Sequence, residues 1–280
     1  MYFSKIKVIG NSSIAERIRD FLSQLGYYIV DDYEEVKVVV GPLSRGLKYV
    51  DKKPVIVVSP SGNYVIPIYK ENKVSFLASI IADLLDSSLV LTSKYAEMGL
   101  YSVQEFSWIN GLYWKVPEKV KEVNKKLLEK GRVSVYVNDD RKRKYYIPKE
   151  GGYNVSEYPC NADIVIGDEG NCNALYLYPY RVIIGLKYIS PIPLEVILYS
   201  IKLTLKSIYL NENRLDVIVS SVSDRRLSEL AKLFNADVVR LDGDTCESLL
   251  LQYGGKIILK GVKRAYGLET CLGVMKVEGL

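Results

Sequence analysis

The sequence of 280 residues contains no histidine. This absence excludes a serine or cysteine nucleophile paired with an imidazole, a zinc site with histidine ligands, and haem held by a proximal histidine. Any proton transfer must therefore use Asp, Glu, Lys, Tyr, Cys or water. Glutamine is also scarce, at Gln24, Gln104 and Gln252 only. Because side-chain amides are thermolabile, we interpret this scarcity as a sign of a heat-adapted source.

Cysteine is sparse and widely spaced. The four cysteines, Cys160, Cys172, Cys246 and Cys271, form no C-x-x-C pair. We therefore predict free, structural thiols rather than a metal site or a disulfide framework. Long hydrophobic runs are missing as well, and the first residues lack the apolar core of a signal peptide. We expect a soluble, cytoplasmic protein with no membrane partner.

The residues that are present have an ordinary globular balance. Hydrophobic residues make up 48% and charged residues 25%, which excludes disorder as the main state. Lys and Arg number 38 against 33 Asp and Glu, a formal net charge of +5. This mild excess favours anionic ligands but is below that of a dedicated nucleic-acid-binding protein. The basic run at residues 141–144 is predicted to be a solvated hairpin, and we expect no nucleic-acid partner.

Short β-branched runs alternate with segments of helical periodicity along the whole chain. Such alternation predicts an α/β protein with largely parallel, buried sheets. The predicted strands cover residues 5–9, 27–30, 36–40, 55–58, 64–68, 89–92, 133–137, 162–167, 182–185, 216–220, 238–241, 256–259 and 270–277, and the predicted helices cover 14–25, 74–85, 117–130, 194–208, 224–234 and 246–252. We predict two three-layer α/β domains, 1–116 and 181–280, joined by a small middle α/β unit, 117–180.

Glycine next to a cation or a hydroxyl follows three predicted strands. The residues concerned are Gly41 and Arg45, then Thr92, Ser93 and Gly99, then Gly185 and Lys187. Ligands of open α/β sheets bind outside the carboxyl ends of strands, so these residues predict a surface for carboxylates. Capping of a helix is the simpler role for Thr92 or Ser93. Gly10 is a lone glycine after the first strand, which argues against a nucleotide-binding oxidoreductase or transferase.

Three stretches of the chain resemble those of a known family. The first is PVIVVSPSGNYVIPI with the later LVLTSKYAEMGLYSVQEF, the second is VPEKVKEVNKKLLEKGRVSVYVND, and the third comprises residues 182–187 and 263–274. These stretches resemble the CbiG family of cobalamin biosynthesis, the cobalt-precorrin-5A hydrolases, and the third is similar to the first and last strands of that family's C-terminal domain. The resemblance covers most of the chain, in the right order.

The resemblance implies a hydrolase that acts on a carbon–carbon bond in the anaerobic, cobalt-early route to vitamin B12. Such an enzyme opens the δ-lactone of a cobalt-bearing contracted tetrapyrrole, on the way to the corrin ring, and releases acetaldehyde. Cobalt would arrive with this substrate, so no cofactor or metal bound by the protein is expected. The expected partners are the cobalt-corrinoid intermediate and other enzymes of the pathway, and a homodimer is compatible with the sequence. An archaeal thermophile is the expected source.

The family has a histidine-containing loop where this chain has residues 69–74, which contain none. A carboxylate would therefore have to orient the water, and Glu71 and Glu97 are the candidates, against the simpler role of solvated loop acids. The residues expected to contact the acetate and propionate arms, or to let the backbone approach them, are Gly41, Arg45, Thr92, Ser93, Gly99, Gly185, Lys187, Lys263 and Arg264. The alternative is a corrinoid-binding homologue that has lost the hydrolase activity.

Overall fold

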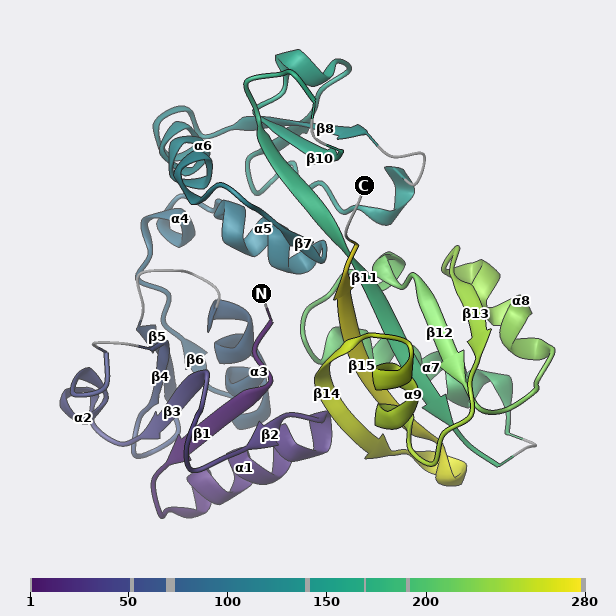
Figure 1. Ribbon diagram of the computed structural model, residues 1–280. Coiled ribbons are helices and arrows are strands. Elements are labelled where there is room, and N and C mark those ends of the chain that lie inside the picture. Colours follow the sequence, from purple (N-terminus) through teal and green to yellow (C-terminus); the bar gives the residue numbers. More distant parts are fainter. Residues whose placement is uncertain are drawn as a thin grey trace.

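A computed structural model describes residues 2–50, 53–68, 74–138, 142–168, 170–189 and 192–277. These residues form two multi-stranded sheets covered by helices, which confirms the predicted α/β class. Figure 1 shows three units: an N-terminal unit (purple and blue), a middle unit (teal) and a C-terminal unit (green and yellow). Within the described ranges, no helix is both long enough and apolar enough to cross a membrane.

The N-terminal unit contains a six-stranded sheet in the order β2-β1-β3-β4-β5-β6. Its strands are β1 (Lys5–Ile9), β2 (Tyr28–Ile29), β3 (Val36–Val40), β4 (Val55–Val58), β5 (Tyr64–Ile68) and β6 (Ser88–Leu89), and its helices are α1 (Ser13–Leu25), α2 (Leu43–Leu47) and α3 (Ser75–Leu85). Neighbouring strands are parallel except β4 and β5, which form the predicted hairpin. The side chain of Ser12 caps α1, and Gly26 ends it at a φ of 100°.

The middle unit has its own core, to which the segment from Leu100 to Leu112 contributes. Its elements are α4 (Lys94–Glu97), α5 (Val103–Ile109), β7 (Leu112–Tyr113), α6 (Pro117–Lys130), β8 (Val133–Asn138), the 3-10 turn η2 (Lys142–Lys144), β9 (Tyr153–Val155), η3 (Pro159–Asn161) and β10 (Ile164–Gly167). Helix α6 begins at a proline and ends at Gly131, whose φ is 67°, as its sequence predicts. The predicted strand at 89–92 is shorter, because the exposed Leu91 leaves the sheet towards α4.

Strand β11 (Leu175–Lys187) is 13 residues long and belongs to both the middle and the C-terminal units. Its first half pairs in parallel with β10, beginning at Ile164 opposite Leu175. Its second half pairs in parallel with β12, beginning at Ile183. The expected boundary between residues 180 and 181 therefore lies inside one continuous strand, which Figure 1 shows running between the two units.

The C-terminal unit is a mixed sheet between two helical layers. Its remaining elements are α7 (Leu194–Lys206), η4 (Glu212–Arg214), β12 (Val217–Ser220), α8 (Arg226–Leu233), β13 (Asp237–Arg240), α9 (Cys246–Gln252), β14 (Lys256–Lys263), η5 (Ala265–Gly267) and β15 (Glu269–Lys276). Strands β11, β12 and β13 are parallel, and β15 is antiparallel to both β11 and β14. Helix α7 packs on one face of this sheet and α9 on the other.

The prediction of four free thiols is wrong for one pair. Cys160 and Cys172 form a disulfide with a Cα–Cα distance of 4.8 Å, whereas Cys246 and Cys271 are free and buried, as predicted. The disulfide joins η3, which precedes β10, to the loop that follows β10. Their 12-residue separation gave no motif by which the sequence alone would show this contact.

The predicted solvated hairpin at 141–144 is also wrong for Lys144, while residues 139–141 lie outside the described ranges. The Lys144 side chain is buried, and its Nζ lies 3.0 Å from Oδ1 of Asp216 and donates to the carbonyl of Leu215 at 2.9 Å. Arg214, which is fully buried, also pairs with Asp216, at 3.3 Å. We call Lys144, Arg214 and Asp216 the junction cluster, because it joins the middle unit to the C-terminal unit.

Contacts also join the N-terminal unit to the others. The Tyr27 hydroxyl donates to the carbonyl of Ser207 at 2.9 Å, and the backbone N–H of Lys260 donates to the carbonyl of Gly26 at 2.8 Å. A Cβ at Gly26 would also lie 3.0 Å from the carbonyl oxygen of Lys260, so a side chain at residue 26 would crowd this contact. The Tyr2 hydroxyl donates to the carbonyl of Trp108 in α5 at 2.5 Å, so all three units pack against one another.

Candidate anion-binding site

The C-terminal sheet gathers several strand ends at one edge. The parallel strands β11, β12 and β13 all have their carboxyl ends there, β14 ends there, and β15 begins there. We call this edge, at the lower right of Figure 1, the carboxyl edge. It is the place where ligands bind in open α/β sheets. Three of the predicted cations lie at it, since β11 ends at Lys187 and β14 ends at Lys263, with Arg264 next.

Lys187 and Lys263 share the face that α9 covers. Both lie opposite Glu269 in the pairing register, so the three side chains are on the same side of the sheet. The Nζ of Lys187 donates to the carbonyls of Gly243, at 3.4 Å, and of Asp244, in the loop before α9. Lys263 is exposed, and among the described residues neither lysine has a carboxylate within ion-pair distance.

Arg264 lies on the other face, beside α7. Its Nε donates to Oγ1 of Thr270 at 3.4 Å, and the buried Thr270 also contacts Thr204 of α7 at 3.2 Å. Burial lowers the pKa of Arg264, and the nearby Tyr199 only partly opposes this. No carboxylate of the described residues pairs with this half-buried guanidinium. A desolvated cation without a counter-charge is unfavourable, so the position is suited to an incoming anion.

Gly185 lies near this edge but not at its surface. A Cβ there would come within 2.7 Å of both the Cys246 carbonyl oxygen and the Cys271 sulfur. The glycine therefore lets the start of α9 pack closely on β11. This packing accounts for a glycine at this position, and its approach to a ligand stays a prediction.

The structure places Gly41 and Arg45 elsewhere. Arg45 on α2 folds back over Gly41, where a Cβ would lie 3.2 Å from the arginine Cδ. In Figure 1, α2 and the tip of β11 lie at opposite sides of the molecule. Arg45 and the cations of the carboxyl edge therefore do not lie on one surface.

The residues after β6 form a third location, around α4. Ser93 caps α4 by accepting a hydrogen bond from the N–H of Ala96 at 3.2 Å, the simpler of its two expected roles. Thr92 and Glu97 are exposed, and Gly99 ends the turn with a φ of 67°. Glu71, the other candidate base, lies outside the described residues. In Figure 1, α4 lies at the left and the carboxyl edge at the lower right, so Glu97 is not at the carboxyl edge.

A basic hollow that the sequence did not reveal lies between α6 and α4, the helix that carries Glu97. It has a volume of about 430 Å³ and is lined by Lys94, Tyr95, Lys121, Asn124, Lys125, Leu128 and Glu129 of α4 and α6. The signal in the sequence was the spacing of four between Lys121 and Lys125, which places both on one face of α6.

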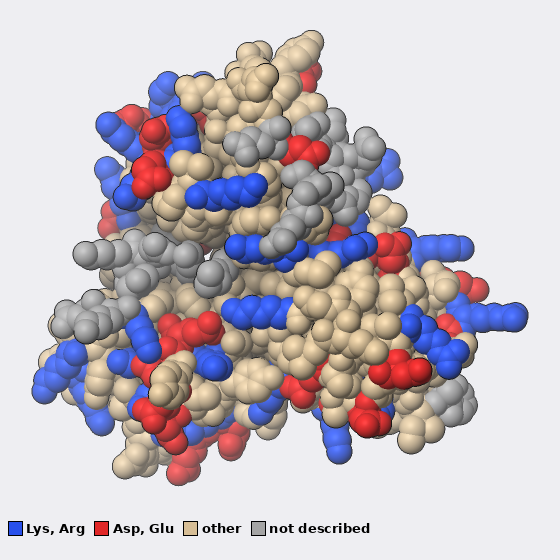
Figure 2. All heavy atoms as spheres, viewed as in Figure 1, with Lys and Arg blue, Asp and Glu red and all other residues tan. Residues whose placement is uncertain are grey.

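A second group of cations that sequence reasoning missed lies where β7 pairs with β11. The Nζ of Lys115 is 4.2 Å from the ring centre of Tyr178, and that of Lys276 is 5.0 Å from the ring centre of Tyr113. These two tyrosines are opposite each other in the ladder. On the face shown in Figure 2, basic side chains cross the middle of the molecule, where the three units meet. The surface charge thus agrees with the preference for anions inferred from composition.

A resident metal has no evident site in these parts of the chain. Among the described residues, no group of three or more Cys, Asp or Glu side chains could hold a metal ion. The described Lys and Arg side chains can bind anions, and carboxylates are available as bases.

Fold and site together define an α/β protein with a cationic carboxyl edge. Its sequence matches no known protein-family profile and no curated protein. Its structure is similar to a crystal structure described as a cobalamin biosynthesis protein G homolog from Sulfolobus solfataricus, with a TM-score of 0.60 and 16% identity. The similarity covers 98% of each chain. The two proteins therefore share the whole arrangement of units, despite little sequence in common.

Proposed function

We propose that this protein acts in cobalamin biosynthesis and binds a cobalt-corrinoid intermediate through the carboxylates of its side arms. The fold shared over 98% of both chains supports the pathway, as does the resemblance of the sequence segments. The observation that carries the ligand class is Arg264, which is half-buried at the carboxyl edge and has no carboxylate partner within the described residues. Arginine binds carboxylates in a fork, with two parallel hydrogen bonds.

The proposed reaction is hydrolysis of the δ-lactone of cobalt-precorrin-5A. Water adds to the lactone carbonyl and the ester C–O bond breaks, which leaves a carboxylate and a hydroxyl. The hydroxyl then loses its proton as the adjoining carbon–carbon bond breaks, the electron pair of that bond passes to the macrocycle, and the two-carbon fragment leaves as acetaldehyde. A carboxylate orients the water and takes its proton, and lysine side chains stabilise the oxyanion. Glu97, on the helix that carries Lys94 of the basic hollow, and Glu71 remain the proposed bases.

A second candidate is a corrinoid-binding protein without hydrolase activity. Two observations favour it: the chain contains no histidine, and the exposed Glu97 has no ion-pair partner among the described residues. A base that is exposed and far from the carboxyl edge is poorly placed to act on a substrate bound there.

The test is anaerobic incubation of the purified protein with cobalt-precorrin-5A, following acetaldehyde and the corrinoid absorption spectrum together. Release at a catalytic rate, abolished in Glu97→Gln or Glu71→Gln while the spectral shift is retained, supports the hydrolase. A spectral shift without acetaldehyde supports the binding protein. Absence of both signals overturns the corrinoid proposal.

Arg264→Met tests the ligand site, with Arg181→Met as the matched control. Arg181 is 38% exposed and lies on β11 well before the strand reaches the carboxyl edge. Corrinoid affinity should fall at least tenfold in the first variant and stay unchanged in the second. Equal affinity in both variants would show that the carboxyl edge does not hold the substrate.

A further inference from the structure

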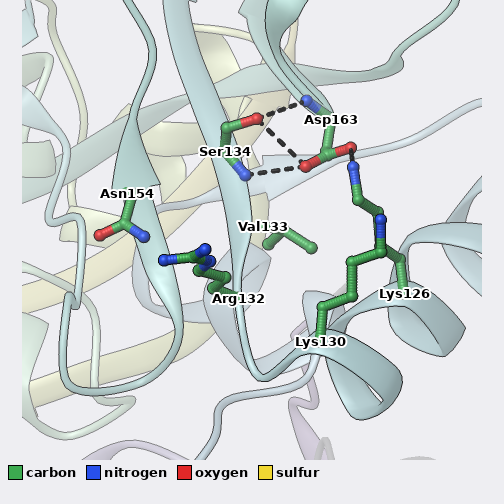
Figure 3. Close-up of a pocket in the computed structure, with 7 residues that line it drawn as sticks. All are labelled: Lys126, Lys130, Arg132, Val133, Ser134, Asn154 and Asp163. Atoms are coloured by element: carbon green, nitrogen blue, oxygen red, sulfur yellow. Dashed lines mark hydrogen bonds and ion pairs between the residues drawn. The ribbon is translucent and has the colours of Figure 1, made fainter.

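The middle unit contains a second hollow, lined by other residues of α6 than the basic hollow. Figure 3 shows it between the last turns of α6 and the first residues of β8, with β9 alongside. It has a volume of about 350 Å³ and is lined by Lys126, Lys130, Arg132, Val133, Ser134, Asn154 and Asp163. It lies at the amino ends of the parallel strands β8 and β10.

One wall of this hollow is a fixed and neutralised ion pair. Asp163 accepts hydrogen bonds from the N–H of Ser134 at 2.9 Å and from its hydroxyl at 3.1 Å, and it pairs with Lys126. Burial alone would raise the pKa of Asp163, but these contacts outweigh it and lower the pKa. Asp163 therefore stays ionised, and its charge cancels that of Lys126.

The other cations of the hollow are not neutralised. Lys130 and Arg132 are exposed, and neither forms an ion pair or a side-chain hydrogen bond with any described residue. Together they leave the hollow with two positive charges beyond the Lys126–Asp163 pair. Asn154 lies opposite Ser134 in the parallel ladder, so its amide is on the same face of the sheet. Figure 3 shows the Arg132 guanidinium beside Asn154.

These groups match the chemistry of one kind of ligand. A guanidinium offers a planar fork of donors, a lysine offers a compact charge, and an amide offers two further N–H groups. Two unneutralised positive charges complement a dianion, and phosphate has the oxygens to engage several donors at once. We propose that this hollow binds a phosphate group, either as inorganic phosphate or as the phosphate of a small phosphomonoester. The site is separate from the carboxyl edge and is independent of the proposed corrinoid chemistry.

Calorimetric titration with inorganic phosphate, in the absence of any corrinoid, tests the site. We expect saturable binding of one phosphate per chain, weakened about tenfold or more by Arg132→Met and several-fold by Lys130→Met. Lys119→Met is the matched control, since Lys119 is on the same helix, pairs with Glu122 and lines neither hollow. Thermal unfolding should show that all these variants are folded.

Two further measurements identify the source of the phosphate and test the contribution of Lys126. Tighter binding of glycerol 3-phosphate than of inorganic phosphate indicates a phosphomonoester, and equal or weaker binding indicates the free ion. Asp163→Asn should tighten phosphate binding, because it releases Lys126 from its partner. Absence of saturable binding, or an equal loss in Lys119→Met and Arg132→Met, overturns the proposal.

Discussion

The junction cluster and the carboxyl edge both contain a buried or half-buried arginine, but the two arginines have different surroundings. In the junction cluster, Arg214 donates to the carbonyls of Asn110, at 2.7 Å, and Tyr180, at 2.8 Å, and pairs with Asp216. At the carboxyl edge, Arg264 has one side-chain hydrogen bond among the described residues, to Thr270 at 3.4 Å. A fully satisfied cation holds protein segments together, whereas a desolvated cation with free donors is available to a ligand.

Asp216→Asn should have the largest effect, because it leaves the cations of the junction cluster buried without their carboxylate. Burial tends to raise the pKa of Asp216, but Arg214 and Lys144 outweigh this and lower it. We expect a loss of about 3–5 kcal/mol in the free energy of unfolding. Denaturant titration measures this loss, with Asp237→Asn as the control, since Asp237 is 73% exposed in its pair with Arg181. A similar small change in both variants would contradict the structural role of the cluster.

Arg264→Met should show the opposite pattern, with little change in stability and a clear loss of binding. Removing a poorly paired cation changes the free energy of unfolding by less than about 1 kcal/mol. Corrinoid affinity should fall at least tenfold, which corresponds to about 1.4 kcal/mol or more. Thermal unfolding and spectral titration measure the two quantities. A destabilisation as large as that of Asp216→Asn would erase the contrast between the two regions.

Asp224 gives an intermediate case, because its arginine partner is half exposed. Hydrogen bonds from Arg226 are the main cause that lowers the pKa of Asp224 from 3.8 to about 2. A carboxylate with a lowered pKa stabilises the fold at pH values above its unfolded pKa, and this contribution is lost as the pH falls through about 2. The melting temperature of Asp224→Asn should therefore lie below that of the wild type at neutral pH, and the difference should close between pH 3.8 and about 2. A difference that is constant with pH would contradict this assignment.

Lys263→Ala should have the smallest effect. The side chain is exposed and has no ion-pair partner among the described residues, so stability should change by no more than about 0.5 kcal/mol. Its long-range attraction for the corrinoid carboxylates should lower affinity only a few-fold, and less at high salt. Spectral titration at two salt concentrations measures this dependence. A loss equal to that of Arg264→Met would show that exposed and half-buried cations contribute alike.

Local signals account for the parts of the fold that the sequence predicts well. Ser12 and Gly26 delimit α1, and Pro117 and Gly131 delimit α6, because caps act through the neighbouring backbone. Strand β11 was predicted only in its last part. Pro179 lies in its middle, where the strand pairs with the two-residue β7, and only the tertiary pairing shows that the strand continues through it.

The candidate site is less predictable, because it depends on where distant strand ends meet. Lys187 was predicted from its strand end and from the resemblance, and Lys263 from the resemblance alone. The register places both opposite the same residue of β15, which the sequence did not predict. Whether a cation is neutralised depends on contacts such as Lys144 with Asp216, which are 72 residues apart. No periodicity or short motif shows such a contact.

Strand β11 also determines how the middle and C-terminal units can move relative to each other. At about 3.3 Å per residue, its 13 residues span about 40 Å, and hydrogen-bonded ladders hold it at both ends. A flexible linker would act as a free hinge, whereas β11 is hydrogen-bonded in both units. A rotation of one unit against the other therefore has to twist or bend this strand.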